Sequence, residues 1–178
     1  NGWKRQKQTH RLISTIYHMD KPVIAAVNGA ASGLGCDLAL ACDFIMAGPA
    51  ASFSMTYLRR GLIPDGGGLY FLPRRVGTTR AKELIFSART IAADEAEQIG
   101  LADRLADADA LLDDACQWAK SLCFGPASAV ALSKSILNRS VDLPLETVFA
   151  LGSEAQSICY ASDEHHDAVT AFLDKSSR

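Results

Sequence analysis

The spacing of apolar residues changes along the chain. In the first half, short β-branched runs such as Pro22–Val27 alternate with stretches of helical spacing, and glycines separate them. The order of strand, glycine-rich turn and helix is typical of α/β proteins, so we expect an α/β fold. The predicted elements of this half are helices at 3–19 and 33–42 and strands at 22–27, 44–47 and 51–55.

The second half is almost wholly helical in pattern. The irregular segment from Tyr57 to Gly68 contains Pro64 and three consecutive glycines, which predicts a loop leading into a helix. Further helices are expected at 78–88, 93–99, 109–123, 127–139, 144–160 and 164–175, with one short strand at 101–105. We therefore divide the chain into a core at 1–123 and a C-terminal helical region at 124–178.

Composition narrows the classes of function. The chain has 178 residues, a formal net charge of −2 and 48% hydrophobic residues, which is typical of an ordinary globular domain and not of a nucleic-acid-binding polycation. Its apolar runs are shorter than the roughly 18 residues that cross a bilayer, so we expect neither nucleic-acid nor membrane partners. The five cysteines lack C-x-x-C spacing, which favours a reducing cytoplasm and predicts no metal site.

The first segment with candidate chemistry is the turn Gly33-Leu34-Gly35, which joins the first strand region to a helix. The first backbone N–H groups of a helix lack intrahelical acceptors, and the helix dipole is positive there, so the turn suits an anion or a developing oxyanion. The glycines have an equally good explanation in close packing of the helix on the sheet. The spacing matches neither the dinucleotide-binding G-x-G-x-x-G motif nor the P-loop.

The second segment, Gly61–Gly68, places Asp65 between Ile63 and the apolar positions of the following helix. A carboxylate partly removed from water there would be a better proton acceptor near neutral pH. Asp65 also suits the N-cap of a helix that begins near Gly67, and the segment by itself favours this simpler interpretation.

Together, several segments resemble the enoyl-CoA hydratase/isomerase (crotonase) superfamily in order and spacing. They are Lys21–Gly29, Gly33–Asp43, Phe53–Met55, Gly61–Gly77, Ala93–Leu101 and Ala171–Lys175. The resemblance implies a crotonase-like ββα spiral core with a C-terminal helical trimerisation region, in a homotrimer or a dimer of trimers. It also implies an acyl-CoA substrate, of which coenzyme A is a part, and no separate cofactor.

The resemblance also implies roles for single residues. The backbone N–H of Leu34 matches one of the two oxyanion donors of the family. Hydratases carry two glutamates, and the matching positions here are Asp37 and Tyr57, so the sequence departs from the hydratase pattern at both; Asp37 nevertheless stays a candidate catalytic residue. Asp65 falls where double-bond isomerases carry a catalytic aspartate, and its surroundings are most similar to the phenylacetate-type enoyl-CoA isomerases.

These matches predict an enoyl-CoA isomerase in which Asp65 moves a proton between two carbons while the N–H of Leu34 stabilises the dienolate. One alternative is a hydratase of the same superfamily, with Asp37 acting alone or with Asp65. Another is a catalytically silent acyl-CoA-binding protein. The predicted substrate-binding residues are Gly33, Gly35, Met55, Tyr57, Pro64 and Gly66, and Phe172 and Lys175 are predicted to reach coenzyme A bound to a neighbouring subunit.

Compared with the family, the chain is short at its front. We expect the missing part to supply early strands of the sheet and the second oxyanion donor. This chain by itself is then expected to leave one face of its sheet uncovered and half of the oxyanion hole absent.

Overall fold

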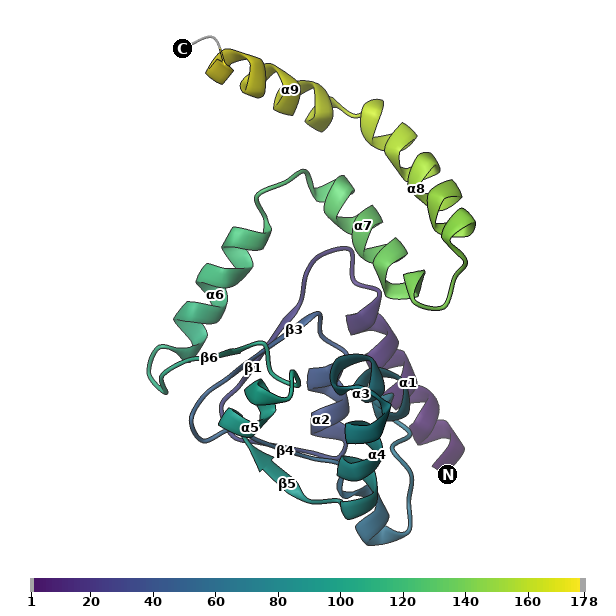
Figure 1. Cartoon of the computed structure of the whole chain (residues 1–178), viewed down its shortest axis with the longest axis vertical. Helices are drawn as coiled ribbons and strands as arrows, with labels where there is room; N and C mark the ends of the chain where they lie inside the picture. Colours follow the sequence, from purple (N-terminus) through teal and green to yellow (C-terminus); the bar gives the residue numbers. More distant parts are fainter. Residues whose placement is uncertain (1, 177–178) are drawn as a thin grey trace. The chain divides into compact units, whose positions relative to one another are not determined.

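The computed structural model describes residues 2–176, with side chains described as far as residue 174. The chain comprises two compact units, Asn1–Lys120 and Ser121–Arg178 (Figure 1). The first unit holds all the strands of the described residues, and the second is helical.

Two three-stranded sheets form the frame of the first unit. Strands β1 (Ile24–Val27), β3 (Phe44–Ala47) and β6 (Arg104–Leu105) are parallel and lie in the order β1-β3-β6. Strands β2 (Ala30–Ser32), β4 (Ser52–Ser54) and β5 (Thr90–Ala92) lie in the order β2-β4-β5, with β4 parallel to β2 and antiparallel to β5. Strands β1 and β2 are followed in the chain by β3 and β4 in the same arrangement. As a result β3 lies beside β1 in one sheet, and β4 lies beside β2 in the other.

Helices of the first unit cover these sheets and connect their strands (Figure 1). They are α1 (Gly2–Tyr17), α2 (Leu34–Leu40), the 3-10 helix η1 (Thr56–Arg60), α3 (Gly68–Val76), α4 (Thr78–Ser87), α5 (Ala93–Gln98) and α6 (Leu111–Leu122). Helix α2 packs on β2, β3 and α3, so that the helix after the glycine turn lies at the centre of the unit.

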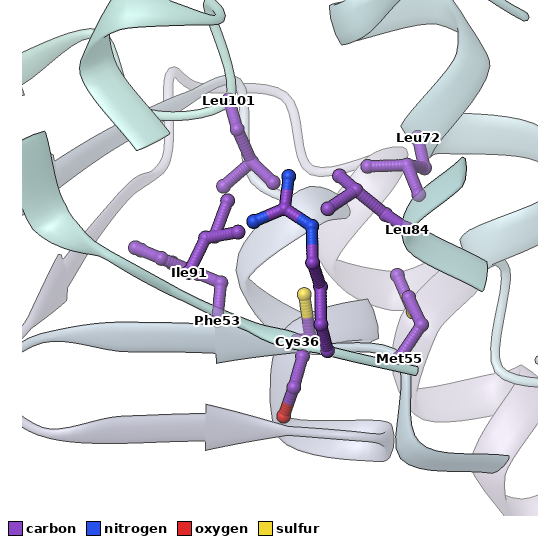
Figure 2. A pocket seen from close by; sticks show the side chains of 9 residues that line it. Cys36, Phe53, Met55, Leu72, Leu84, Ile91 and Leu101 are labelled. Atoms are coloured by element: carbon purple, nitrogen blue, oxygen red, sulfur yellow. The ribbon is translucent and has the colours of Figure 1, made fainter. Parts of the chain in front are cut away.

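The core holds α2 firmly in place. Cys36 of α2 is 1% exposed and lies beside a small internal cavity with apolar walls (Figure 2). The labelled walls come from β4, β5, α3, α4 and the segments between them, and are Phe53, Met55, Leu72, Leu84, Ile91 and Leu101. Burial raises the pKa of the Cys36 thiol to about 12. Because Cys36 is packed on all sides, the position of its neighbour Asp37 is fixed as well.

The predicted elements of this unit differ from the structure at several places. Strands β2 and β5 were predicted as turn or coil, and the strand predicted at 101–105 is reduced to Arg104–Leu105. The helix predicted to reach residue 42 ends at Leu40, and the predicted loop at 57–68 begins with η1. Segments of three residues are too short for a hydrophobic period, and pairing with a neighbouring strand stabilises them instead.

The second unit consists of α7 (Ala127–Ser140), α8 (Leu145–Tyr160) and α9 (Asp163–Ser176). Helix α8 contacts both α7 and α9, and Glu164 accepts a hydrogen bond from the hydroxyl of Ser128. Large apolar side chains of this unit, such as Phe149 and Ile158, are exposed in this chain. Across the residues that the structure describes, none of the helices is both long and apolar enough to traverse a membrane.

Candidate active site

The turn from β2 into α2 requires glycine at position 33. The φ angle of Gly33 is 53°, in the left-handed region that other residues rarely adopt. A Cβ at this position would also lie 3.4 Å from Oγ1 of Thr56 and 3.9 Å from two ring carbons of Tyr57. The glycine turn is therefore pressed against the start of η1.

This turn leaves backbone donors at the start of α2. The carbonyl oxygen of Gly33 accepts hydrogen bonds from the N–H groups of Cys36 and Asp37, at 3.0 and 3.1 Å. The N–H groups of Leu34 and Gly35 precede them and have no acceptor among the described residues. The start of α2 thus presents two backbone N–H groups without an intrahelical acceptor, of which that of Leu34 is the predicted oxyanion donor.

Asp37 lies in the interior, one turn into α2. Its exposed fraction is 0%, and the hydroxyl of Tyr57 donates a hydrogen bond to its Oδ2. Its Oδ1 faces the backbone of Gly68, where an added Cβ would lie 2.5 Å away, but it has no hydrogen-bond partner among the described residues. A Cβ at Gly66 would collide with Oδ2. Glycine at 66 and 68 therefore provides the space that the Asp37 carboxyl group occupies.

Burial raises the pKa of Asp37 from its usual 3.8 to about 6, and the nearby charge of Asp65 adds to this increase. The Tyr57 hydroxyl and the N–H groups of Gly66 and Gly68 oppose it. Burial and the Asp37 carboxylate raise the pKa of half-buried Tyr57 well above its usual value, so the phenol stays neutral and acts as a hydrogen-bond donor. Asp37 can therefore exchange a proton near neutral pH.

Asp65 lies in the segment between η1 and α3 and is half-buried. Helix α3 begins at Gly68 with Gly67 as its N-cap, and no side-chain cap is present, so the interpretation of Asp65 as the N-cap is wrong. Gly67 has a φ of 108°, which turns the chain into the helix without a capping side chain. The carboxylate of Asp65 is thus half-buried and does not cap helix α3.

A solvent-open pocket of about 650 Å³ lies beside Asp65. Its walls come from α1, from the glycine segment and from α3, and they include Ile13, Tyr17, Gly66, Gly67, Tyr70 and Phe71. The tyrosine rings of α1 and α3 pack edge to face, with centroids 6.1 Å apart. The pocket therefore places an apolar, largely aromatic wall next to a carboxylate.

Several residues predicted to form the site are brought together. Tyr57 contacts Asp37, the glycine turn at 33 lies against Tyr57, and an added Cβ at Gly66 would lie 2.9 Å from the side chain of Leu34. Gly35 follows Leu34 on the first turn of α2. These residues therefore lie together around the start of α2.

Other predicted residues are placed differently. Met55 is 2% exposed and lines the internal cavity of Figure 2, and Pro64 is also buried. Both side chains therefore belong to the interior of the unit. Phe172 lies on α9 of the second unit and is 70% exposed. The side chain of Lys175 lies outside the described residues. The role of both at coenzyme A stays a prediction.

Two residues near Asp65 were not predicted as part of the site. Gln6 and His10 of α1 both form hydrogen bonds to Asp65. Their spacing of four residues places them on one helix face, which continues through the buried Ile13 to Tyr17. Gln6 and His10 continue, at a spacing of three to four residues, the helix face that carries Ile13 and Tyr17. This spacing is the sequence signal that could have identified them.

The ββα frame and this site define the class of protein. The sequence model described as enoyl-CoA hydratase/isomerase matches residues 3–178, and the chain belongs to this family. The crystal structure of an enoyl-CoA hydratase/isomerase from Cupriavidus metallidurans is similar, with a TM-score of 0.91 and 43% identity, over 97% of this chain and 65% of that one. The predicted crotonase-like fold is thereby confirmed.

Among particular relatives, the chain is 40% identical to the short-chain-enoyl-CoA hydratase of Clostridium acetobutylicum over 157 residues, which are 88% of this chain and 60% of that protein. It is 36% identical to the 1,2-epoxyphenylacetyl-CoA isomerase of Escherichia coli over 176 residues, 99% of this chain and 67% of that protein. The chain therefore spans less than two thirds of the Clostridium hydratase. The similarity to phenylacetate-type isomerases is one of several, and most of the related proteins carry hydratase names.

Proposed function

We propose that this protein isomerises the double bond of an enoyl-CoA thioester. The observation that supports this proposal best is the hydrogen bond from Tyr57 to the fully buried Asp37. These are the two positions at which hydratases of the family carry glutamates that bind and activate water. Here the two side chains bond to each other, while Asp65 remains as the carboxylate beside an apolar pocket.

In this proposal the backbone performs the electrostatic part of the reaction. The N–H of Leu34 donates to the thioester carbonyl oxygen, which gains negative charge when a proton leaves the acyl chain. Such a donor contributes most when it is held rigidly, and the packing of Cys36 in the core holds the start of α2. A donor of this kind typically lowers the barrier by about 2.7–4 kcal/mol.

Asp65 performs the proton transfer in this proposal. Its carboxylate removes a proton from one carbon of the acyl chain and returns it to another on the same face, so the double bond moves and no water is added. The aromatic walls of the neighbouring pocket, Tyr17, Tyr70 and Phe71, supply apolar surface for the acyl chain. Coenzyme A is part of the substrate, and no separate cofactor takes part.

Hydration is the second candidate activity, and one observation favours it. Asp37 has a pKa of about 6 and an Oδ1 without a hydrogen-bond partner among the described residues, so it can exchange a proton with a water molecule that reaches it. Two of the relatives are hydratases by name, the short-chain-enoyl-CoA hydratase of Clostridium acetobutylicum at 40% identity and the crotonyl-CoA hydratase of Syntrophomonas wolfei at 37%. In this alternative, Asp37 acts alone or together with Asp65.

The two activities are separated by supplying a 3-enoyl-CoA and crotonyl-CoA in separate assays. Isomerisation of the first without hydration of the second is expected. Asp65→Asn is expected to lower the isomerisation rate by about 10²–10⁴-fold, the usual contribution of a general acid–base group, with thioester binding nearly unchanged. Rapid hydration without isomerisation contradicts the proposal, and binding without conversion of either substrate favours a silent acyl-CoA-binding protein.

The same proposal includes an assembly of three subunits, or two such trimers, built through α7–α9, and a place in the cytoplasm. The exposed apolar side chains of these helices, such as Phe149 and Ile158, supply surface for such contacts. Sedimentation equilibrium of the protein tests the assembly, and a monomer at micromolar concentration contradicts it.

A further inference from the structure

Two side chains of α1 hold Asp65 at two different points. The Nε2 group of Gln6 donates to the carboxylate oxygen Oδ2 at 3.1 Å. The Nε2 group of His10 lies 2.8 Å from the backbone carbonyl oxygen of Asp65, and since a carbonyl oxygen only accepts, the ring donates this hydrogen bond. One contact therefore orients the side chain and the other fixes the backbone from which it projects.

The segment that carries Asp65 needs such support. It lies outside every helix and strand, and the glycines that follow it lack side chains that could anchor it. On its inner side, Asp37 occupies the space at Gly66 and Gly68. On its outer side, two side chains of α1, Gln6 and His10, form hydrogen bonds to Asp65.

Helix α1 is itself fixed to the core, so its contacts can hold Asp65 in place. Ile13, one turn beyond His10, is 6% exposed and belongs to the hydrophobic core. Tyr17, one turn further, packs edge to face against Phe71 of α3, with ring centroids 5.1 Å apart. The same face of α1 thus packs on the core at one end and bonds to Asp65 at the other.

We infer that Gln6 and His10 are positioning residues for the proton transfer by Asp65, an inference that rests on the proposed isomerase function. Besides burial, the charge of Asp65 also raises the pKa of Asp37 on α2 and of Tyr57 on η1, and His10 bonds to the backbone of Asp65. Of all these contacts, Gln6 makes the side-chain hydrogen bond to the carboxylate itself.

The inference is tested with Gln6→Leu and Gln6→Glu, with Gln8→Leu as the control on an exposed position of the same helix. We expect Gln6→Leu to lower kcat for the 3-enoyl-CoA roughly tenfold, as for the loss of one hydrogen bond, with KM nearly unchanged. Gln6→Glu, which places a second negative charge beside Asp65 and removes the donor, should lower kcat at least as much as Gln6→Leu. Gln8→Leu should match the wild type.

For the backbone contact, His10→Ala should lower kcat by a similar factor, and His10→Gln, which keeps a donor, should recover part of the loss. Unfolding curves of all variants show whether they fold. If Asp65→Asn abolishes isomerisation but the Gln6 and His10 variants keep the wild-type kcat, the inference is wrong while the proposed function stands. If Asp65→Asn keeps full activity, both are wrong.

Discussion

Asp37→Asn replaces a buried carboxyl group with a neutral group of nearly the same size, and the comparison isolates the effect of its charge on stability. Burial raises the pKa of Asp37 from 3.8 to about 6 in the folded protein. Between these pH values the folded protein keeps a proton that the unfolded chain has released. The contribution of Asp37 to stability is therefore most favourable below the lower value and is lost as pH rises to about 6.

The size of the effect follows from this difference in pKa. At about 1.36 kcal/mol for each unit, the loss across the window is about 3 kcal/mol. Asparagine does not titrate, so the free energy of unfolding of Asp37→Asn, relative to the wild type, should rise by about 3 kcal/mol between roughly pH 3 and pH 8. Urea denaturation at a series of pH values measures it, with the buried Trp118 as a fluorescent reporter.

Tyr57→Phe is the matched variant for this experiment. It removes the hydroxyl that donates to Asp37 and favours its charged form, so the loss of stability should extend to higher pH and be larger in total. Above the pKa of Asp37, the lost hydrogen bond to a charged group should cost about 1.5–3 kcal/mol. A difference between Asp37→Asn and wild type that stays constant with pH, or falls as pH rises, would refute burial as the cause of the altered pKa.

Three further experiments test the packing around Asp37, the reaction catalysed and the burial of Cys36. Gly68→Ala places a Cβ 2.5 Å from Oδ1 of Asp37 and should lower the free energy of unfolding by about 1–3 kcal/mol, whereas Gly35→Ala, whose Cβ meets nothing within 4 Å, should change it by less than about 1 kcal/mol in urea denaturation. Combining Asp37→Glu with Tyr57→Glu restores both carboxyl groups of the hydratase pattern and should raise hydration of crotonyl-CoA about tenfold or more; an unchanged rate would mean that the substrate does not reach these positions. Cys36, 1% exposed and with a pKa of about 12, should resist iodoacetamide in the folded protein while the exposed cysteine of α6 reacts, and mass spectrometry of rapidly labelled Cys36 would contradict its burial.

Much of the α/β frame could be predicted because its signals are local. The strand regions at 22–27 and 44–47 contain apolar runs, and glycines mark the turns that follow them. Strand β2 could not be predicted, because its three residues carry no period and Ala31 is a strand residue only through its partner Phe53 on β4. Strand formation there depends on an element 22 residues away in the sequence.

The site shows the same division between local and distant causes. The glycine turn and the Asp65 segment could be predicted, since each is contained within a short motif. The hydrogen bond between Tyr57 and Asp37 joins residues 20 positions apart, and the bond from Gln6 to Asp65 joins residues 59 positions apart. Such pairs can be predicted only when the packing of α1, α2 and η1 is known. No residue spacing in the sequence encodes that packing.

The packing of Asp37 and Phe71 explains the run of three glycines after Asp65. The Asp37 carboxyl group occupies the positions that side chains at 66 and 68 would take, and the ring of Phe71 occupies that at 67, where an added Cβ would lie 2.6 Å from it. A larger residue at 66 or 68 would therefore push the segment away from Asp37 on α2, and one at 67 would collide with the ring of Phe71 on α3. Because Asp65 immediately precedes this run, its position depends on Asp37 remaining buried. In the isomerase that we propose, Asp37 therefore acts on the position of Asp65 as a buried, hydrogen-bonded group, and Asp65 carries out the proton transfer.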